Sequence, residues 1–400
     1  MGALSDLLSG FSVALSAQNL IYCLIGSLMG TLVGVLPGIG PTSAIAILLP
    51  ITSFLPPMPA IIMLAGIYYG AMYGGSTTSI LLNMPGEVAS VPTCLDGYAM
   101  AKQGRAGPAL AISAISSFFA GTISLLGLTF FAPTLADAAL AFGPPEYFAL
   151  MLFALTMVIN LSGKDIVKGF ISALAGFLTA AIGIDAVSGS SRFTFGSIEL
   201  MGGINFISVI IGLFAIAEIF VSTEEAVTSV FQGKIKGLMP TLMDLKLSLG
   251  AMIRSTFIGF FLGLLPGLST GIMAFMAYDV EKRVSKHPER FGTGMIEGVA
   301  APEGANNSAT SGAFIPLLSL GIPPGPALAV LLGAFMIYGL QPGPLLFEHH
   351  SGFAWGLIAS MYIGNIMLLI LNLPLVRIWV KVCQIPYAIL SPLVLIFSFI

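Results

Sequence analysis

The stretch Gly259–Gly271 reads GFFLGLLPGLSTG, and a related stretch, GTLVGVLPGIGPT, occupies Gly30–Thr42, 229 positions earlier. Both copies place a Leu-Pro-Gly tripeptide inside apolar sequence. Proline resists a helix interior because it lacks a backbone donor, and the glycine after it permits a positive φ. Each copy therefore predicts a sharp turn between two apolar arms. Two related broken segments in one apolar chain predict a binding site at the interface of two repeats.

Composition sets the protein class. The chain has 400 residues, 56% of them hydrophobic and 8% charged, whereas a soluble chain carries about 25% charged residues. We therefore predict an all-α polytopic protein in a lipid bilayer. Lys and Arg are too scarce for a nucleic-acid surface. The three cysteines and three histidines fit no ligand spacing, so no metal or other cofactor is expected.

Four segments follow from the distribution of apolar and polar residues. We predict an amphipathic N-terminal helix on the membrane surface over 1–19, a first repeat half over 20–221, a cytoplasmic linker over 222–250, and a second repeat half over 251–400. The chain stops at Ile400 inside an apolar run, so we expect further C-terminal spans beyond it.

Each half begins with a predicted hairpin. Leu20–Leu36 and Ser43–Leu55 flank the first Leu-Pro-Gly, and Met252–Leu265 and Ser269–Tyr278 flank the second. Each arm of the first pair is shorter than the roughly 20 residues that span a bilayer. We read each pair as the arms of a hairpin with Pro37 or Pro266 at its tip. Two tilted full spans remain the alternative.

A broken crossing follows each hairpin. In Ala60–Val91, the interruptions are GGSTTS at 74–79 and then Pro85-Gly86. In Met295–Leu340, they are EGANNSATSG at 303–312 and then GIPPGP at 321–326. Non-helical backbone at membrane depth occurs only within protein or beside a cavity. We therefore predict a transmembrane helix broken at these motifs in each half.

Positive charge predicts the orientation of the two halves. Lys and Arg concentrate in 102–105, 164–168, 234–254, 282–290 and 377–381, which the positive-inside rule places in the cytoplasm. Counting crossings from these loops makes the first hairpin open outward and the second inward. The repeats are then inverted, the arrangement that supports alternating access.

The hairpin tips are the first group of candidate binding residues. A tip of this kind exposes backbone N–H groups at the start of its second arm, and helix N-termini favour anions. A structural kink is the alternative. Glycines repeated every fourth residue beside the tips predict close helix packing. The substrate-binding candidates are Gly38, Gly40, Thr42, Ser43, Gly267, Ser269 and Thr270, with Pro37 and Pro266 as hinges.

The polar stretches of the broken crossings are the second group. Their amides and hydroxyls offer both donors and acceptors, and a polar helix–helix contact is the alternative. The candidates are Ser76, Thr77, Thr78, Asn83, Asn306, Asn307, Ser308, Thr310 and Ser311. Glu87 and Glu303 near the breaks are possible cation ligands. No Lys or Arg is expected at mid-membrane, so an anionic substrate would be held by N–H groups, hydroxyls, amides and a co-bound cation.

Three stretches resemble the large membrane subunit of the tripartite tricarboxylate transporters (TctA type). They are GTLVGVLPGIGPTSAIAILLP, YYGAMYGGSTTSILLNMPGE and APEGANNSATSGAFIPLLSLGIPPGP. The resemblance implies secondary uptake of a citrate-like di- or tricarboxylate, driven by an ion gradient that is usually sodium. It also implies a small integral membrane subunit, a periplasmic substrate-binding protein and a place in the bacterial inner membrane.

Other functions stay open from the residues alone. A membrane enzyme would need a histidine, a carboxylate pair or a metal cluster in the membrane, and the sequence offers none, so we expect no enzyme. An ion channel needs pore-lining rings, which inverted broken repeats disfavour. A transporter of another small anion without a binding protein is the remaining alternative.

Overall fold

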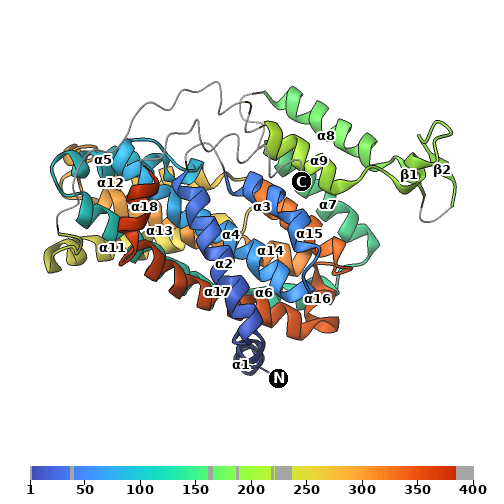
Figure 1. The fold of residues 1–400 in the computed structure, drawn as a ribbon, viewed down its shortest axis with the longest axis horizontal. Helices are drawn as coiled ribbons and strands as arrows, with labels where there is room; N and C mark the ends of the chain where they lie inside the picture. The colour runs from blue at the N-terminus through green and yellow to red at the C-terminus, as the bar shows by residue number, and fades with distance from the viewer. Residues whose placement is uncertain are drawn as a thin grey trace.

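The computed structural model is almost entirely helical and describes residues 2–36, 40–160, 165–185, 189–217, 220 and 237–383 (Figure 1). Four described helices are long and apolar enough to cross a membrane: α2 (Ala17–Val35), α6 (Ala106–Leu140), α11 (Leu242–Gly263) and α17 (Ser351–Asn372). With so few charged residues, the chain is an all-α membrane protein. The other described elements are α1 (Ala3–Ala14), α3 (Pro41–Thr52), α4 (Pro57–Leu82), η1 (Val88–Ser90), α5 (Val91–Lys102), α7 (Pro144–Asn160), α8 (Ile166–Ala180), β1 (Gly183–Ile184), β2 (Ser191–Arg192), η2 (Glu199–Gly202), α9 (Phe206–Ile210), η3 (Ile211–Ile216), α12 (Thr270–Val284), η4 (Pro288–Arg290), α13 (Glu297–Gly312), α14 (Phe314–Leu320), α15 (Pro326–Ile337), α16 (Pro344–His349) and α18 (Val376–Val382).

Helices α4 and α13 form the centre of the molecule. Every residue is buried from Pro59 to Leu82 in α4 and from Gly298 to Gly312 in α13. Helix α2 packs along α4, whereas α11 and α6 pack along α13. The two stretches richest in Ser, Thr and Asn thus lie inside the protein, away from lipid.

The repeated glycines let helices approach closely in both halves. A Cβ atom on Gly34 of α2 would lie 2.3 Å from the Ala71 carbonyl oxygen of α4. In the second half, a Cβ on Gly259 of α11 would lie 2.2 Å from the Ala305 oxygen of α13. The predicted packing role of these glycines is confirmed. Helices α2 and α11 therefore lie directly against the backbones of the polar helices α4 and α13, respectively.

The predicted interruptions at 74–79 and 303–312 were wrong, because α4 and α13 run unbroken through them. The hydroxyls donate to carbonyls one turn back: Ser76 Oγ to Tyr73 O at 2.9 Å and Thr310 Oγ1 to Asn306 O at 2.8 Å. This internal bonding satisfies the hydroxyls without breaking the helix. The chain leaves helical geometry further on, between α4 and η1 and between α14 and α15, at the predicted Pro-Gly pairs.

The second hairpin tip has the geometry that Leu-Pro-Gly predicts. Gly267 adopts φ 85° between α11 and α12, and its N–H donates to Pro324 O at 3.1 Å. The tip therefore contacts the break that precedes α15. In the first half, residues 37–39 lie outside the described residues, so the described part of that tip is its end at Gly40, where α3 begins.

Asp96 ties helix α5 to the connection between α12 and α13. Its carboxylate is fully buried and accepts from the N–H groups of Gly292, Gly294 and Met295 at 2.7–3.0 Å. It also accepts from Tyr278 Oη at 2.8 Å. A buried carboxylate needs such donors to replace water. Asp96 thus links a helix of the first half to the second half.

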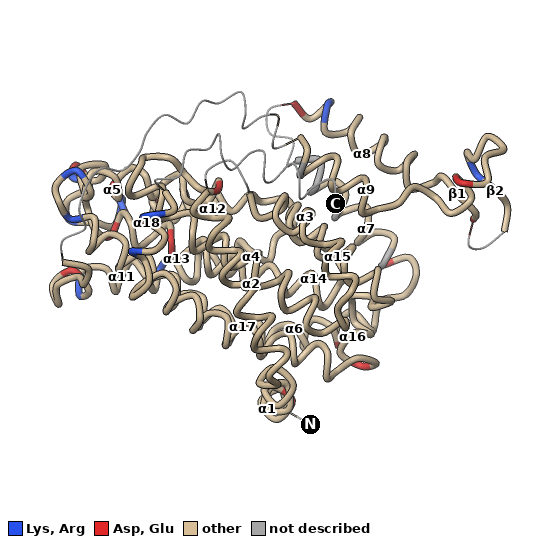
Figure 2. The backbone as a smooth tube through the Cα atoms, in the orientation of Figure 1, with Lys and Arg blue, Asp and Glu red and all other residues tan. Residues whose placement is uncertain are grey.

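Charged residues are unevenly distributed along the bundle. Figure 2 shows Lys and Arg gathered at one end, around α5, α11, α12 and α18. Lys168 in α8 and Arg192 in β2 lie elsewhere. Glu348, at the end of α16, precedes α17, and α18 follows α17. Glu348 and α18 therefore lie at opposite ends of α17. The positions of 102–105, 282–290 and 377–381 agree with the predicted grouping on one side, whereas Lys168 of the predicted segment 164–168 lies away from it. Residues 234–236 of the segment 234–254 lie outside the described residues.

Candidate functional site

A cavity of about 590 Å³ lies between the starts of α3, α12 and α15 and the Pro-Gly segment that follows α4. Four segments far apart in the sequence border it: the start of α3, the break after α4, the start of α12 and the break before α15. The lining residues are Gly40, Pro41, Thr42, Tyr68, Met72, Pro85, Gly86, Glu87, Val88, Val91, Gly263, Leu268, Ser269, Thr270, Met273, Ala309, Ala313, Pro324, Gly325, Pro326, Ala327 and Leu328.

Three helices begin at this cavity. The N-cap residues of α3, α12 and α15 are Gly40, Ser269 and Gly325, and all three line it. The first turn of a helix leaves its N–H groups without intrahelical partners, and the aligned peptide dipoles make that end partly positive. The three helix starts therefore contribute partial positive charge to the cavity, and its described lining residues include no Lys or Arg.

The three helix starts differ in how they are capped. Ser269 Oγ accepts from the Gly271 N–H at 3.2 Å, so α12 carries a cap of its own. Gly40 and Gly325 have no side chain to cap α3 and α15, and both helices have proline at the first position. The next N–H groups of α3 and α15 are therefore available to a bound carboxylate.

Glu87 is the one acidic residue of the cavity lining. Its side chain is 8% exposed. Glu87 Oε2 accepts from the Ala89 N–H at 2.5 Å, and Oε1 accepts from Asn306 Nδ2 at 3.3 Å. Asn306 also donates to Met72 O at 3.2 Å. The carboxylate is thus held at the cavity wall by its own short helix and by the central helix α13.

Glu303 lies behind this wall. It is fully buried, and its Oε1 accepts from Thr93 Oγ1 of α5 at 2.5 Å. Among the described residues, neither Glu303 Oε2 nor Asn306 Oδ1 has a hydrogen-bond partner. Both side chains are cation-ligand candidates by chemistry, but neither reaches the cavity lining. The described residues contain no group of three or more His, Cys, Asp or Glu side chains suited to a metal ion.

The predicted tip residues divide between the cavity and its surroundings. Ser43 turns away from the lining, because its Oγ donates to Phe214 O at 2.9 Å. Gly267 and Pro266 stand just outside the lining, and Pro37 and Gly38 lie outside the described residues. The predicted residues that line the cavity are Gly40, Thr42, Glu87, Ser269 and Thr270.

The predicted polar residues of α4 and α13 lie beside the cavity without lining it. Asn307 Nδ2 donates to Ser117 Oγ of α6 at 2.7 Å, and Ser308 Oγ donates to Thr256 O of α11 at 2.6 Å. These are the contacts that the helix–helix alternative expects. Asn83 ends α4 in the left-handed conformation with φ 59° and is exposed. Also outside the lining are Ser76, Thr77, Thr78, Asn306, Thr310 and Ser311.

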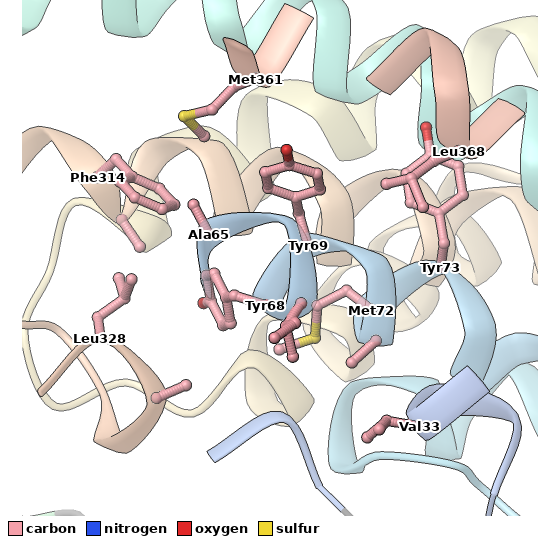
Figure 3. Packing of buried hydrophobic residues seen from close by; sticks show 14 of the residues in the cluster. Val33, Ala65, Tyr68, Tyr69, Met72, Tyr73, Phe314, Leu328, Met361 and Leu368 are labelled. Atoms are coloured by element: carbon pink, nitrogen blue, oxygen red, sulfur yellow. The ribbon is translucent and has the colours of Figure 1, made fainter. Parts of the chain in front are cut away.

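Sequence reasoning missed the apolar wall of the cavity. Tyr68 and Met72 of α4 and Leu328 of α15 belong to it. Figure 3 shows Tyr68 and Met72 on the side of α4 toward Leu328, whereas Tyr69 and Tyr73 point toward Met361 and Leu368. The three tyrosines look equivalent in the sequence. The recurrence of Pro-Gly at 85–86 and 324–325 was the available signal for the breaks that line the cavity.

Comparisons with known proteins place the chain in a family. A model of the family described as "Tripartite tricarboxylate transporter TctA family" matches residues 20–400. An "Uncharacterized 52.8 kDa protein in TAR-I ttuC' 3'region" of Agrobacterium vitis is 49% identical over 399 residues, which are 100% of this chain and 80% of that protein. An "Uncharacterized protein in TAR-II ttuC' 3'region" of the same organism is 51% identical over 140 residues, 35% of this chain and 58% of that protein. No solved structure matches.

Proposed function

Because this chain belongs to the tripartite tricarboxylate transporter TctA family, we propose that it imports a citrate-like di- or tricarboxylate. Import would use a cation gradient, with Na⁺ as the coupling ion. The partners would be a periplasmic substrate-binding protein that delivers the anion and a small integral membrane subunit. The site of action would be the bacterial inner membrane.

The convergence of three helix starts on one cavity carries this proposal. The starts of α3, α12 and α15 all face the cavity, which contains hydroxyls at Thr42, Ser269 and Thr270. Carboxylates are stabilised at such N-termini by N–H groups and by the helix dipoles. A fixed cationic side chain would bind an anion tightly and slow its release. Backbone N–H groups bind it without that fixed charge.

Separate helix starts favour a substrate with more than one carboxylate. Helices α3 and α15 pack against each other, so their uncapped starts can share one carboxylate. The start of α12, on a different hairpin, would take a second. A monocarboxylate would engage one of these positions at a time and bind more weakly.

An ion channel, or a transporter of another small anion that needs no binding protein, is the competing function. A channel passes its ion down the gradient without saturating at low concentration. A transporter saturates and accumulates its substrate. The four-segment border of the cavity favours a transporter, because a site made by two hairpins and two breaks can be exposed to either side in turn.

Uptake of labelled citrate into proteoliposomes tests the proposal. The vesicles would hold this chain with its small membrane subunit, and the binding protein would be added outside, with and without an inward Na⁺ gradient. Accumulation that needs both the gradient and the binding protein supports the proposed transporter. Citrate accumulation that needs neither the Na⁺ gradient nor the binding protein would refute the proposal. If the vesicles take up no citrate, a screen of other carboxylates would follow.

A further inference from the structure

Glu87 places a carboxylate where the cavity is otherwise built for anions. The surrounding helix starts and hydroxyls favour negative charge, yet the Glu87 side chain lines the same cavity. Two like charges at a protein cavity repel each other more strongly than they would in bulk water. An ionised Glu87 would therefore oppose the binding of an anionic substrate. Something must neutralise Glu87 when the substrate is present.

Hydrogen bonds hold Glu87 at the cavity and keep it from turning away. The Ala89 N–H and Asn306 Nδ2 each hold one carboxylate oxygen. Ser90 Oγ donates to the Glu87 carbonyl at 2.9 Å and fixes the backbone. Behind it, a Cβ on Gly75 would lie 2.8 Å from Glu87 Cγ. The side chain is therefore enclosed by packing, and its open direction is the cavity.

No described basic residue faces Glu87 to neutralise it. The titratable groups that interact with it electrostatically are Tyr68 of α4, Cys94 of α5 and Glu303 of α13. The α12 and α15 residues of the lining, such as Thr270, Met273 and Leu328, carry no charge. The neighbours are thus neutral or acidic, and the missing positive charge must come from solution.

We propose that Glu87 couples anion binding to a monovalent cation: the cavity accepts its carboxylate substrate only when a proton or Na⁺ neutralises Glu87. This inference rests on the proposed function, because it assumes that the cavity binds an anion. Asn306 acts as a positioning residue, since its amide donates to Glu87 Oε1 at 3.3 Å. Neutralisation by the cation and entry of the anion then stabilise each other, as reciprocal coupling requires.

Glu303 does not fill this role in the structure. It is fully buried and does not line the cavity, so its charge is further from a bound anion. It joins α13 to α5 through Thr93.

Citrate binding to the purified chain, measured by isothermal titration calorimetry, tests the proposal. One series varies pH without Na⁺, and the other varies NaCl against choline chloride at constant pH and ionic strength. One coupled cation changes the citrate Kd by about tenfold per pH unit, or per tenfold change in Na⁺. The series that responds identifies the cation. In Glu87→Gln, the citrate Kd should lose the wild-type dependence on that cation, while the exposed control Glu348→Gln keeps it.

A wild-type citrate Kd that changes with neither pH nor Na⁺ would overturn the proposal. So would a Glu87→Gln protein whose citrate Kd keeps the wild-type dependence on the cation. Should the wild type bind no citrate, the proposed substrate fails, and thermal unfolding without any anion then tests Glu87 directly. The proposal expects the unfolding temperature to depend on the same cation in wild type and in the charge-retaining Glu87→Asp, but not in Glu87→Gln. An equal response in all three would refute it.

Discussion

Thr42 and Ser43 are neighbours in the sequence but have different surroundings. Thr42 lines the cavity, whereas Ser43 donates its hydroxyl to the Phe214 carbonyl. We expect Thr42→Val to raise the citrate Kd by about ten- to a hundredfold, because a hydrogen bond to a charged group contributes about 1.5–3 kcal/mol. Ser43→Ala should leave the Kd unchanged and lower the unfolding free energy by about 1 kcal/mol. Calorimetry and thermal unfolding distinguish the two effects. Equal loss of affinity in both variants would contradict this assignment.

Gly34 tests the close packing of α2 on α4. An added methyl group would meet the Ala71 carbonyl oxygen at 2.3 Å, so the helices would have to separate. We expect Gly34→Ala to lower the unfolding free energy by about 1–3 kcal/mol. Gly176 of α8 is the control, because a Cβ there meets nothing within 4 Å. Gly176→Ala should be neutral or slightly stabilising, since alanine favours helix. Unfolding midpoints in detergent that fall equally in both variants would contradict the packing argument.

At the scale of elements, sequence patterns predicted the Pro-Gly breaks and the second tip. They also predicted two interruptions where α4 and α13 are in fact continuous. Serine, threonine and glycine disfavour helix in water, and that led to the predicted interruptions at 74–79 and 303–312. In the protein, Gly74 lets α4 approach Thr31 of α2, and hydroxyls such as that of Ser79 bond within the helix. Local propensity cannot reveal either effect, because it counts neither the close approach of a neighbouring helix nor hydrogen bonds from side chains to the carbonyls of the same helix.

The Asp96 contact gives a prediction about how elements are joined. Asp96→Asn replaces an acceptor by an amide whose NH₂ group faces the N–H donors of Gly292, Gly294 and Met295. We expect it to lower the unfolding free energy by about 2–3 kcal/mol, and Tyr278→Phe to cost about 1 kcal/mol. Released from α5, the α12–α13 connection should be cut faster by trypsin at Arg290. Unchanged cleavage in Asp96→Asn would show that this connection is held by other contacts.

At the scale of the whole molecule, α17 separates two groups of charged residues. Glu348 precedes α17, whereas Lys381 follows it at the end where Lys and Arg gather. In a background without Cys94, we expect Glu348→Cys to react with a membrane-impermeant maleimide in intact cells. Lys381→Cys should react only after the membrane is opened, because α17 is long enough to cross once. Labelling of both positions from the same side would refute the orientation.

The cavity itself was partly predictable from the sequence. The repeated Leu-Pro-Gly and Pro-Gly motifs identified the segments that meet there, and Thr42, Ser269 and Thr270 were expected to bind. The distinction between Tyr68 and its neighbour Tyr69 was not predictable, because it depends on which helix of the second half covers each face of α4. The hydrogen bond of Ser43 was not predictable either, because its partner, Phe214, lies 171 positions away.

The buried helix α13 also has a consequence for biogenesis. With Glu303, Asn306 and Asn307 along its length, this segment would be costly to release alone into lipid from the translocation channel. Its polar partners, Ser117 and Ser124 of α6 and Thr256 of α11, are all synthesised before it. The ribosome therefore synthesises α13 after α6 and α11, the helices that provide its polar partners. A circular permutation that moved α13 ahead of α6 would leave it without those partners and expose it to membrane quality control.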